Sequence, residues 1–137
     1  MMLVDSSVWI DFLRCKETLQ TDFLKNNLRK RRLITADLVL AEVLQGTRNE
    51  RAAEEARNLL LSVTTLVISD EVLAIEAARN YRLLRAKGVT IRSTIDVLIA
   101  TRCINDHYHL LYSDRDFDPF VEHFGLRSAI APPFGLN

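Results

Sequence analysis

The sequence begins MMLVDSSVWIDFL (residues 1–13), and the acid at its fifth position is the first feature that needs an explanation. Residues 1–4 are apolar and predict the start of a buried strand. Asp5 and two serines then lead into an apolar segment that predicts a helix. A carboxylate between a strand and a helix either caps the helix or belongs to a functional site. The rest of the chain has to decide between these two roles.

Short strands and helices alternate along the whole chain. Apolar runs rich in Leu, Ile or Val predict strands at residues 3–5, 33–35, 65–68 and 110–113, with a weaker one near 126–130. Because these runs do not alternate with polar residues, we expect strands buried on both faces. Helical patterns occupy residues 17–29, 37–46, 49–61, 69–87, 93–106 and 117–124, and three of them reach Gly46, Gly88 or Gly125. This order predicts an α/β fold with a parallel sheet, in a single domain over residues 1–137.

Composition limits the class of protein. The chain has 137 residues, 48% of them hydrophobic, which is enough for one compact core. Lys plus Arg and Asp plus Glu both number 18, so any nucleic-acid binding needs local basic patches or metal ions. Cys15 and Cys103 lie outside any C-x-x-C pattern, and neither a signal peptide nor a membrane-spanning run is apparent. We therefore expect a reduced cytoplasmic protein in which both cysteines are small packing residues.

Several acids follow the predicted strands. They are Asp96, in RSTIDVLIATRC (residues 92–103), and Asp114, Asp116 and Asp118, in YHLLYSDRDFD (residues 108–118). Ligands of open α/β sheets lie beyond the carboxyl ends of the strands, so Asp5, Asp96 and Asp114 are expected near one end of the sheet. Taken singly, each could instead cap or begin a helix, with Ser93 and Asp96 forming an acidic variant of the capping box.

Glu42 does not fit the capping explanation. It lies inside DLVLAEVLQG (residues 37–46), where Leu38 and Val39 lie one turn earlier on the same helical face. A carboxylate in the middle of an apolar helix is costly unless it is paired or binds a metal ion. A solvated position at the edge of the helix is the alternative.

The candidate acids favour a hard divalent cation. Carboxylates gathered in one crevice repel one another unless a cation is bound. They offer only oxygen, which suits Mg²⁺ or Mn²⁺ rather than zinc, and the three histidines show no zinc-ligand spacing. A metal ion held in this way neutralises phosphoryl oxygens and activates water. The predicted chemistry is hydrolysis of a phosphodiester bond.

With these residues in view, the chain resembles the PIN-domain ribonucleases, and in particular the VapC-type toxins of toxin–antitoxin modules. The resemblance covers nearly the whole chain and depends on four pieces in order: LVDSSVWIDFL, AEVLQG, IRSTIDVLIA and LLYSDRDFD. It implies a three-layer fold with a short central parallel sheet of four to five strands. It also implies a toxin of a type II module: a Mg²⁺-dependent endoribonuclease, inhibited by its cognate VapB-type antitoxin.

The resemblance assigns roles to individual residues. It makes Asp5 and Asp96 the principal metal ligands, with Glu42 and Asp114 completing the acidic site and Asp116 contributing. Supporting hydrogen bonds are expected from Ser6 or Ser7 and from Thr94. Asp118 is left out, because Pro119 follows it and the acid can simply begin a helix.

Partners and alternatives complete the expectations. Arg29, Lys30, Arg31 and Arg32 form the densest basic run; they suit either a solvated helix end or contacts to RNA phosphates. A homodimer is expected, with apolar surface on residues 38–44 and 59–61. Two other functions stay open: a PIN-fold nuclease of RNA processing or decay without an antitoxin, and a catalytically silent binding module. The sequence does not reveal which RNA is cleaved.

Overall fold

The computed structural model describes residues 1–30 and 32–130, and the chain divides into two compact units. Unit 1 holds Met1–Val67 together with Leu111–Ser113. Unit 2 holds Ile68–Leu110 and the chain from Asp114 onward. The chain therefore leaves unit 1 and returns to it for one short segment. The single domain expected over residues 1–137 stays a prediction.

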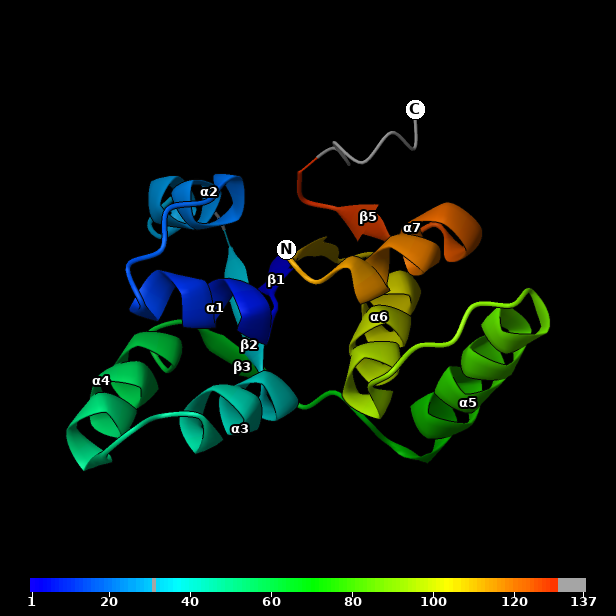
Figure 1. Cartoon of the computed structure of the whole chain (residues 1–137), viewed down its shortest axis with the longest axis horizontal. Helices are drawn as coiled ribbons and strands as arrows, with labels where there is room; N and C mark the ends of the chain where they lie inside the picture. Colours follow the sequence, from blue (N-terminus) through cyan, green and yellow to red (C-terminus); the bar gives the residue numbers. More distant parts are fainter. Residues whose placement is uncertain (31, 131–137) are drawn as a thin grey trace. The chain divides into compact units, whose positions relative to one another are not determined.

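Unit 1 is built from parallel strands joined by pairs of helices (Figure 1). Its elements are β1 (Met2–Val4), α1 (Ser6–Leu13), α2 (Leu19–Asn27), β2 (Leu33–Ala36), α3 (Asp37–Gln45), α4 (Glu50–Leu60) and β3 (Thr64–Leu66). Strand β2 lies between the other two: Leu33 pairs with Met2 of β1, and Ile34 pairs with Thr64 of β3. Every residue of β1 and β2 is buried, as their continuous apolar runs predict.

Unit 2 combines two packed helices with the C-terminal part of the fold. Its elements are α5 (Glu71–Ala86), α6 (Thr94–Asp106), β4 (His109–Leu111), a 3₁₀ turn η1 (Arg115–Phe117), α7 (Asp118–Phe124) and β5 (Arg127–Ser128). Strand β4 pairs in parallel with β5. The last residue of β4, Leu111, already belongs to unit 1, where its carbonyl accepts the Asp5 N–H at 2.9 Å. The strand order is β3-β2-β1-β4-β5. The predicted α/β fold, with a parallel sheet of four to five strands flanked by helices, is confirmed.

Strand β3 departs from the expectation of strands buried on both faces. Thr64 and Thr65 are exposed and Leu66 is half-buried, because β3 is the outermost strand of its side of the sheet. β-branched threonines suit such an exposed edge. The sequence suggested residues 65–68 because Ile68 is apolar, but Ile68 lies beyond the strand and is buried in the segment that leads to α5.

Local capping signals set the ends of the helices. The side chains of Thr18, Asn49 and Asp70 accept backbone N–H groups at the starts of α2, α4 and α5. Gly125 ends α7 with a φ of 71°, a left-handed conformation that glycine adopts without strain. Gly46 ends α3 with an ordinary φ of −87°. The predicted glycine stops are confirmed, although only one of these two needs glycine for its backbone.

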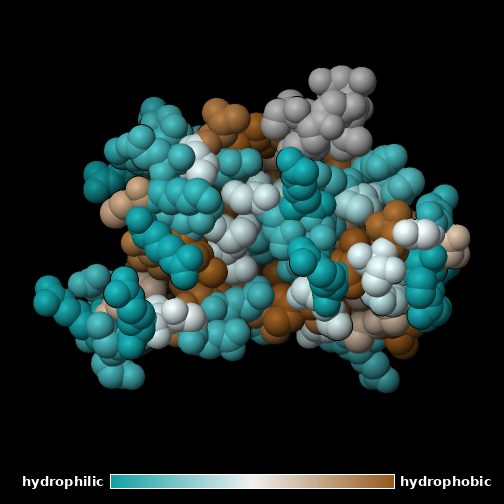
Figure 2. Space-filling view, in the orientation of Figure 1, coloured by the Kyte–Doolittle hydropathy of each residue, from teal (hydrophilic) through white to brown (hydrophobic). Residues whose placement is uncertain are grey.

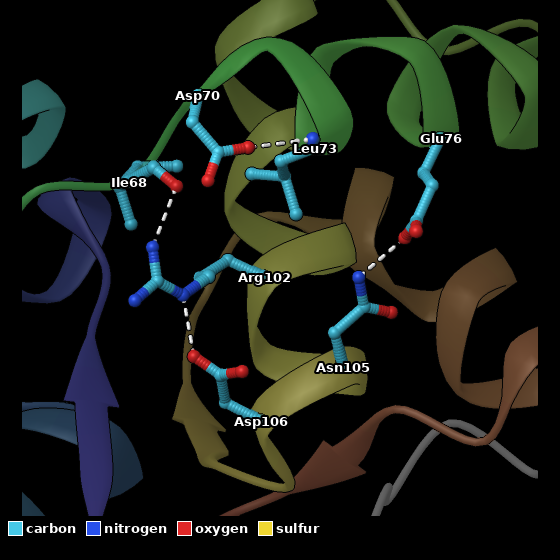
Figure 3. Close-up of polar contacts among 7 residues, drawn as sticks. All are labelled: Ile68, Asp70, Leu73, Glu76, Arg102, Asn105 and Asp106. Carbon is cyan, nitrogen blue, oxygen red and sulfur yellow. Dashed lines mark hydrogen bonds and ion pairs between the residues drawn. The ribbon is translucent and has the colours of Figure 1, made fainter.

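Arg102 of α6 contacts the first residue of unit 2, Ile68 (Figure 3). One of its terminal guanidinium nitrogens donates to the Ile68 carbonyl at 2.8 Å, and its Nε donates to the Asp106 carboxylate. The hydrogen bond to Asp106 is the largest cause of a raised pKa for Arg102. Beside it, Asn105 donates to Glu76 of α5. Side chains of α6 therefore position both the segment before α5 and α5 itself.

Exposed apolar surface lies elsewhere than expected. Val39 and Val43 of α3 are buried and the leucines of that helix are half-buried, so the apolar surface predicted on residues 38–44 is wrong. Leu61 is 45% exposed, in keeping with the prediction for residues 59–61. Larger exposures occur at Val72 and Ile75 of α5, at 65% and 67%, and at Leu19 and Val67, at 65% and 66%. Figure 2 shows hydrophobic residues at the surface in separate patches among hydrophilic ones.

The two cysteines are both free and occupy different environments. Cys103 is buried in α6, as expected for a small packing residue. Cys15 is exposed and adopts a φ of 57° in the turn after α1, so the packing role predicted for it is wrong. Within residues 1–30 and 32–130, none of the helices has the length and apolar character needed to cross a membrane.

Candidate metal centre

Asp5 lies where β1 ends, and its carboxylate caps α1. Its Oδ2 accepts the Ser7 N–H at 3.1 Å and the Ser7 hydroxyl at 2.6 Å. The capping role considered from the sequence is therefore real. It uses only one oxygen, because Oδ1 is buried and has no hydrogen-bond partner among the described residues. A buried carboxylate oxygen with a free lone pair is what a metal ligand requires.

The environment of Asp5 disfavours its charged form when no cation is present. Burial, reinforced by the negative charge of Glu42, raises the pKa of Asp5 to about 6, although the hydrogen bonds from Ser7 oppose the shift. A bound divalent cation would reverse this balance by stabilising the carboxylate. The residues of unit 1 therefore fit a metal ion better than they fit an isolated helix cap.

Glu42 projects from α3 within the same unit. It is half-buried, and its Oε1 accepts the Ser6 hydroxyl at 3.2 Å. The sequence left open whether Glu42 is buried or solvated, and the structure gives an intermediate exposure. Ser6 and Ser7 follow Asp5 directly, and their hydroxyls donate to different acids, Ser6 to Glu42 and Ser7 to Asp5. The supporting role expected of Ser6 or Ser7 stays a prediction.

Unit 2 gathers the other three candidate acids. One carboxylate oxygen from each of Asp96, Asp114 and Asp116 lies within 4.8 Å of the other two. Asp96 is buried in the first turn of α6, whereas Asp114 and Asp116 are half-buried around the 3₁₀ turn. Three carboxylates at this spacing form a candidate site for one divalent cation with oxygen ligands.

Capping interactions position these acids as well. Ser93 accepts the Asp96 N–H at 3.4 Å at the start of α6, and Asp114 Oδ1 accepts the Asp116 N–H at 2.9 Å. Thr94, expected to support Asp96, is exposed and lines a cavity between α5 and α6, so its supporting role stays a prediction. Asp118 begins α7, as expected from the proline that follows it.

Sequence reasoning missed two residues of these clusters. Arg92 places its Nε 3.4 Å from Asp116 Oδ2, with the side chain of Arg92 83% exposed. Ser113 donates its N–H to the Ser7 hydroxyl at 3.2 Å in unit 1. A cation beside a cluster of acids could have been suspected from the Arg-Ser-Thr that precedes Asp96. Nothing in the sequence indicates the contact of Ser113.

The predicted site residues thus fall into two groups. Asp5, Ser6 and Glu42 come together in unit 1, and Asp96, Asp114 and Asp116 come together in unit 2. Arg29, Lys30 and Arg32 are exposed after α2, whereas Arg31 lies outside the described residues. Contacts of this basic run with RNA stay a prediction.

Comparison with known proteins identifies the family of this chain. The PIN domain family matches residues 2–120, and the chain therefore belongs to the PIN domain family. Among curated proteins it is similar to the VapC ribonuclease Mb1587 of Mycobacterium bovis and to ribonuclease VapC11 of Mycobacterium tuberculosis. It is 26% identical to each over 131 residues, which cover 94% of this chain and 98% of the relative.

Solved structures agree on the fold. VapBC-1 from nontypeable Haemophilus influenzae is similar with a TM-score of 0.69 and 18% identity, over 93% of this chain and 95% of that one. VapC20 from Mycobacterium tuberculosis, described as a toxin that cleaves the sarcin–ricin loop, is similar with a TM-score of 0.66 and 19% identity. That match covers 87% of this chain and 94% of VapC20. The family expected from the four sequence motifs is confirmed.

Proposed function

We propose that this protein is a Mg²⁺- or Mn²⁺-dependent endoribonuclease and the toxin of a type II toxin–antitoxin module. The observation that carries the proposal is the cluster of Asp96, Asp114 and Asp116 in a chain of the PIN family, with one carboxylate oxygen from each within 4.8 Å of the other two. The names of the similar VapC ribonucleases support the activity. The oxygen-only ligand set supports the choice of metal ion.

In the proposed site, Asp5 and Asp96 are the principal metal ligands. Glu42, Asp114 and Asp116 complete the acidic site. Membership of the PIN domain family supports a common role for these acids.

Each residue has a defined task in the proposed hydrolysis. The metal ion, when bound, supplies charge neutralisation at the phosphoryl oxygens and activation of the attacking water. Ser7 fixes Oδ2 of Asp5 and leaves Oδ1 available as a ligand. Ser6 orients Glu42 through its hydroxyl, and Asp114 is held by the N–H of Asp116. Groups held in this way lose little freedom when the substrate binds.

The proposal includes a cognate VapB-type antitoxin, a homodimeric state and a cytoplasmic location. Two of the similar structures are named VapBC, which supports an antitoxin partner. The contact of Arg92 with Asp116 indicates how an antitoxin could act, since a guanidinium pairs with carboxylates through directed hydrogen bonds. An arginine from the antitoxin would occupy the place of the cation.

RNA cleavage by the purified protein tests the proposed activity. We expect cleavage with Mg²⁺ or Mn²⁺, loss of cleavage on addition of EDTA, and loss in Asp96→Asn. Asp22→Asn is the matched control, because Asp22 is an exposed acid on α2. Cleavage that survives both EDTA and Asp96→Asn would contradict the proposal.

A growth assay distinguishes the toxin from the alternatives. The intact protein expressed alone should slow growth, and co-expression with the product of the neighbouring gene should relieve it. RNA cleavage without growth arrest or a copurifying partner would favour a nuclease of RNA processing or decay. The absence of cleavage and of metal binding would favour a silent binding module.

A further inference from the structure

A cavity between α5 and α6 lies within unit 2 and is not explained by the metal site. Its volume is about 480 Å³, within the range of small-ligand sites. Apolar side chains form much of its wall, among them Ala74 and Ala77 from α5 and Leu98 from α6. A flat group such as a nucleobase suits a wall of this kind.

The charged groups at this cavity are all of one sign. Arg82 and Arg92 line it, and none of the residues found to line it is Asp or Glu. By contrast, the cavity bordered by Arg14 and Arg48 in unit 1 also includes Glu55. Arg92 already contacts Asp116, whereas Arg82 makes no ion pair among the described residues, so Arg82 favours an anionic ligand. A guanidinium matches the geometry of a phosphate.

Tyr81 adds an aromatic surface to the cavity. The side chain is half-buried, and its ring lies 5.7 Å from the Arg85 guanidinium, at a distance suited to a cation–π contact. Proteins that bind single-stranded nucleic acids use such rings to stack on bases, whatever the base. An aromatic ring beside two arginines suits one nucleotide of a single strand, because the ring can stack on the base and the arginines can bind the phosphates.

Arg92 connects the cavity to the acidic cluster. It lines the cavity, and its Nε lies 3.4 Å from Asp116 Oδ2. We infer that this cavity is a subsite for one nucleotide of a single-stranded RNA, with the base against Tyr81 and the neighbouring phosphates on Arg82 and Arg92. The inference rests on the proposed ribonuclease function and assigns the chemistry that positions the strand beside the metal ligands.

The charges favour RNA over a peptide as the occupant. An apolar helix seated in the cavity would cover Arg82 without supplying an anion, and a buried unpaired charge is costly. A ribonucleotide supplies both the apolar face and the phosphates. We therefore infer that the occupant is nucleic acid. Binding of a protein instead is one outcome of the test.

The test measures RNA affinity by fluorescence anisotropy, with a labelled random-sequence hexaribonucleotide and Mg²⁺. All variants carry Asp5→Asn so that the proposed hydrolysis is off. Tyr81→Leu should weaken binding about 5- to 100-fold, the effect of losing one stacked base, whereas Tyr81→Phe should keep the affinity. Arg82→Gln should flatten the salt dependence of log Kd by about 0.7 for one lost phosphate contact. Arg79→Gln is the control, because Arg79 is an exposed arginine of α5 that does not line the cavity. It should change the affinity and the salt dependence less than Arg82→Gln does.

The outcomes separate this inference from the proposed function. If the protein cleaves RNA but Tyr81→Leu and Arg82→Gln bind the oligonucleotide like their parent, the subsite is refuted and the ribonuclease stands. The same holds if these variants lose only the binding of a second protein. If the protein does not cleave RNA but the variants lose affinity as expected, the subsite stands and the hydrolytic function falls.

Discussion

Replacing Asp5 with asparagine should stabilise the metal-free protein at neutral pH. Burial and the charge of Glu42 raise the pKa of Asp5 from 3.8 to about 6, so the folded state binds this proton more tightly than the unfolded state does. Stability contributed by such a raised acid is present at low pH and is lost as the pH rises from about 4 to about 6. Above that range the wild type carries the full cost of a buried charge.

The magnitude follows from the shift. About two pKa units at 1.36 kcal/mol each correspond to a cost of about 3 kcal/mol at neutral pH. Asparagine caps a helix as well as aspartate, so the start of α1 is retained. The hydrogen bonds from Ser7 to the carboxylate lower this pKa, so their loss in the neutral amide is already contained in the net shift. The net gain is therefore about 3 kcal/mol, or about 10 °C in melting temperature for a chain of this size.

Thermal melts of wild type and Asp5→Asn in EDTA, followed by circular dichroism at about pH 4 and about pH 8, check this prediction. The variant should melt higher at the upper pH, and the difference should vanish at the lower pH. Asp22→Asn serves as the control, because an exposed acid should change the stability by less than about 0.5 kcal/mol at either pH. Added Mg²⁺ should stabilise the wild type more than Asp5→Asn.

A difference between wild type and Asp5→Asn that is the same at both pH values would refute the reasoning. It would mean that the folded protein does not raise the pKa of Asp5. A variant that melts lower than the wild type at the upper pH would show that the hydrogen bond from Ser7 outweighs burial.

Four further predictions follow from other parts of the molecule. Glu42→Gln should also raise the melting temperature without metal and reduce stabilisation by Mg²⁺, as measured in the same melts. Gly125→Ala should lower stability by about 1 kcal/mol because its φ is 71°, whereas Gly46→Ala, at a φ of −87°, should be nearly neutral; urea titration compares them. Light scattering at micromolar concentration should give the mass of a dimer. Charge reversal of an arginine in the antitoxin's tail should restore nuclease activity to the copurified pair.

The positions of the acids could be predicted from the sequence because each follows a local rule. A strand that ends at Val4 places Asp5 at the start of a helix, and a serine at position 93 places Asp96 in the first turn of the next one. Such rules depend on neighbours in the chain, which the sequence shows directly. The acids of unit 2 therefore come together as expected.

The contacts that the sequence did not reveal depend on residues far apart in the chain. Arg92 meets Asp116 across 24 positions, and Ser113 meets Ser7 across 106. The exposure of Thr64 and Thr65 follows from the place of β3 at the edge of the sheet, which no local pattern records. Cys15 differs from Cys103 because it lies in a left-handed turn after α1 rather than inside α6.

The carboxylate of Asp114 caps the 3₁₀ turn through the N–H of Asp116 while it also belongs to the acidic cluster. Substitutions of Asp114 affect these two roles differently. An asparagine keeps an oxygen for the N–H and removes the charge, so catalysis could be lost in one nucleotide change without loss of the fold. An alanine removes both. A population of PIN-family genes that drifts towards inactivity should therefore accumulate asparagine at this position before it accumulates alanine, and the resulting proteins should still fold.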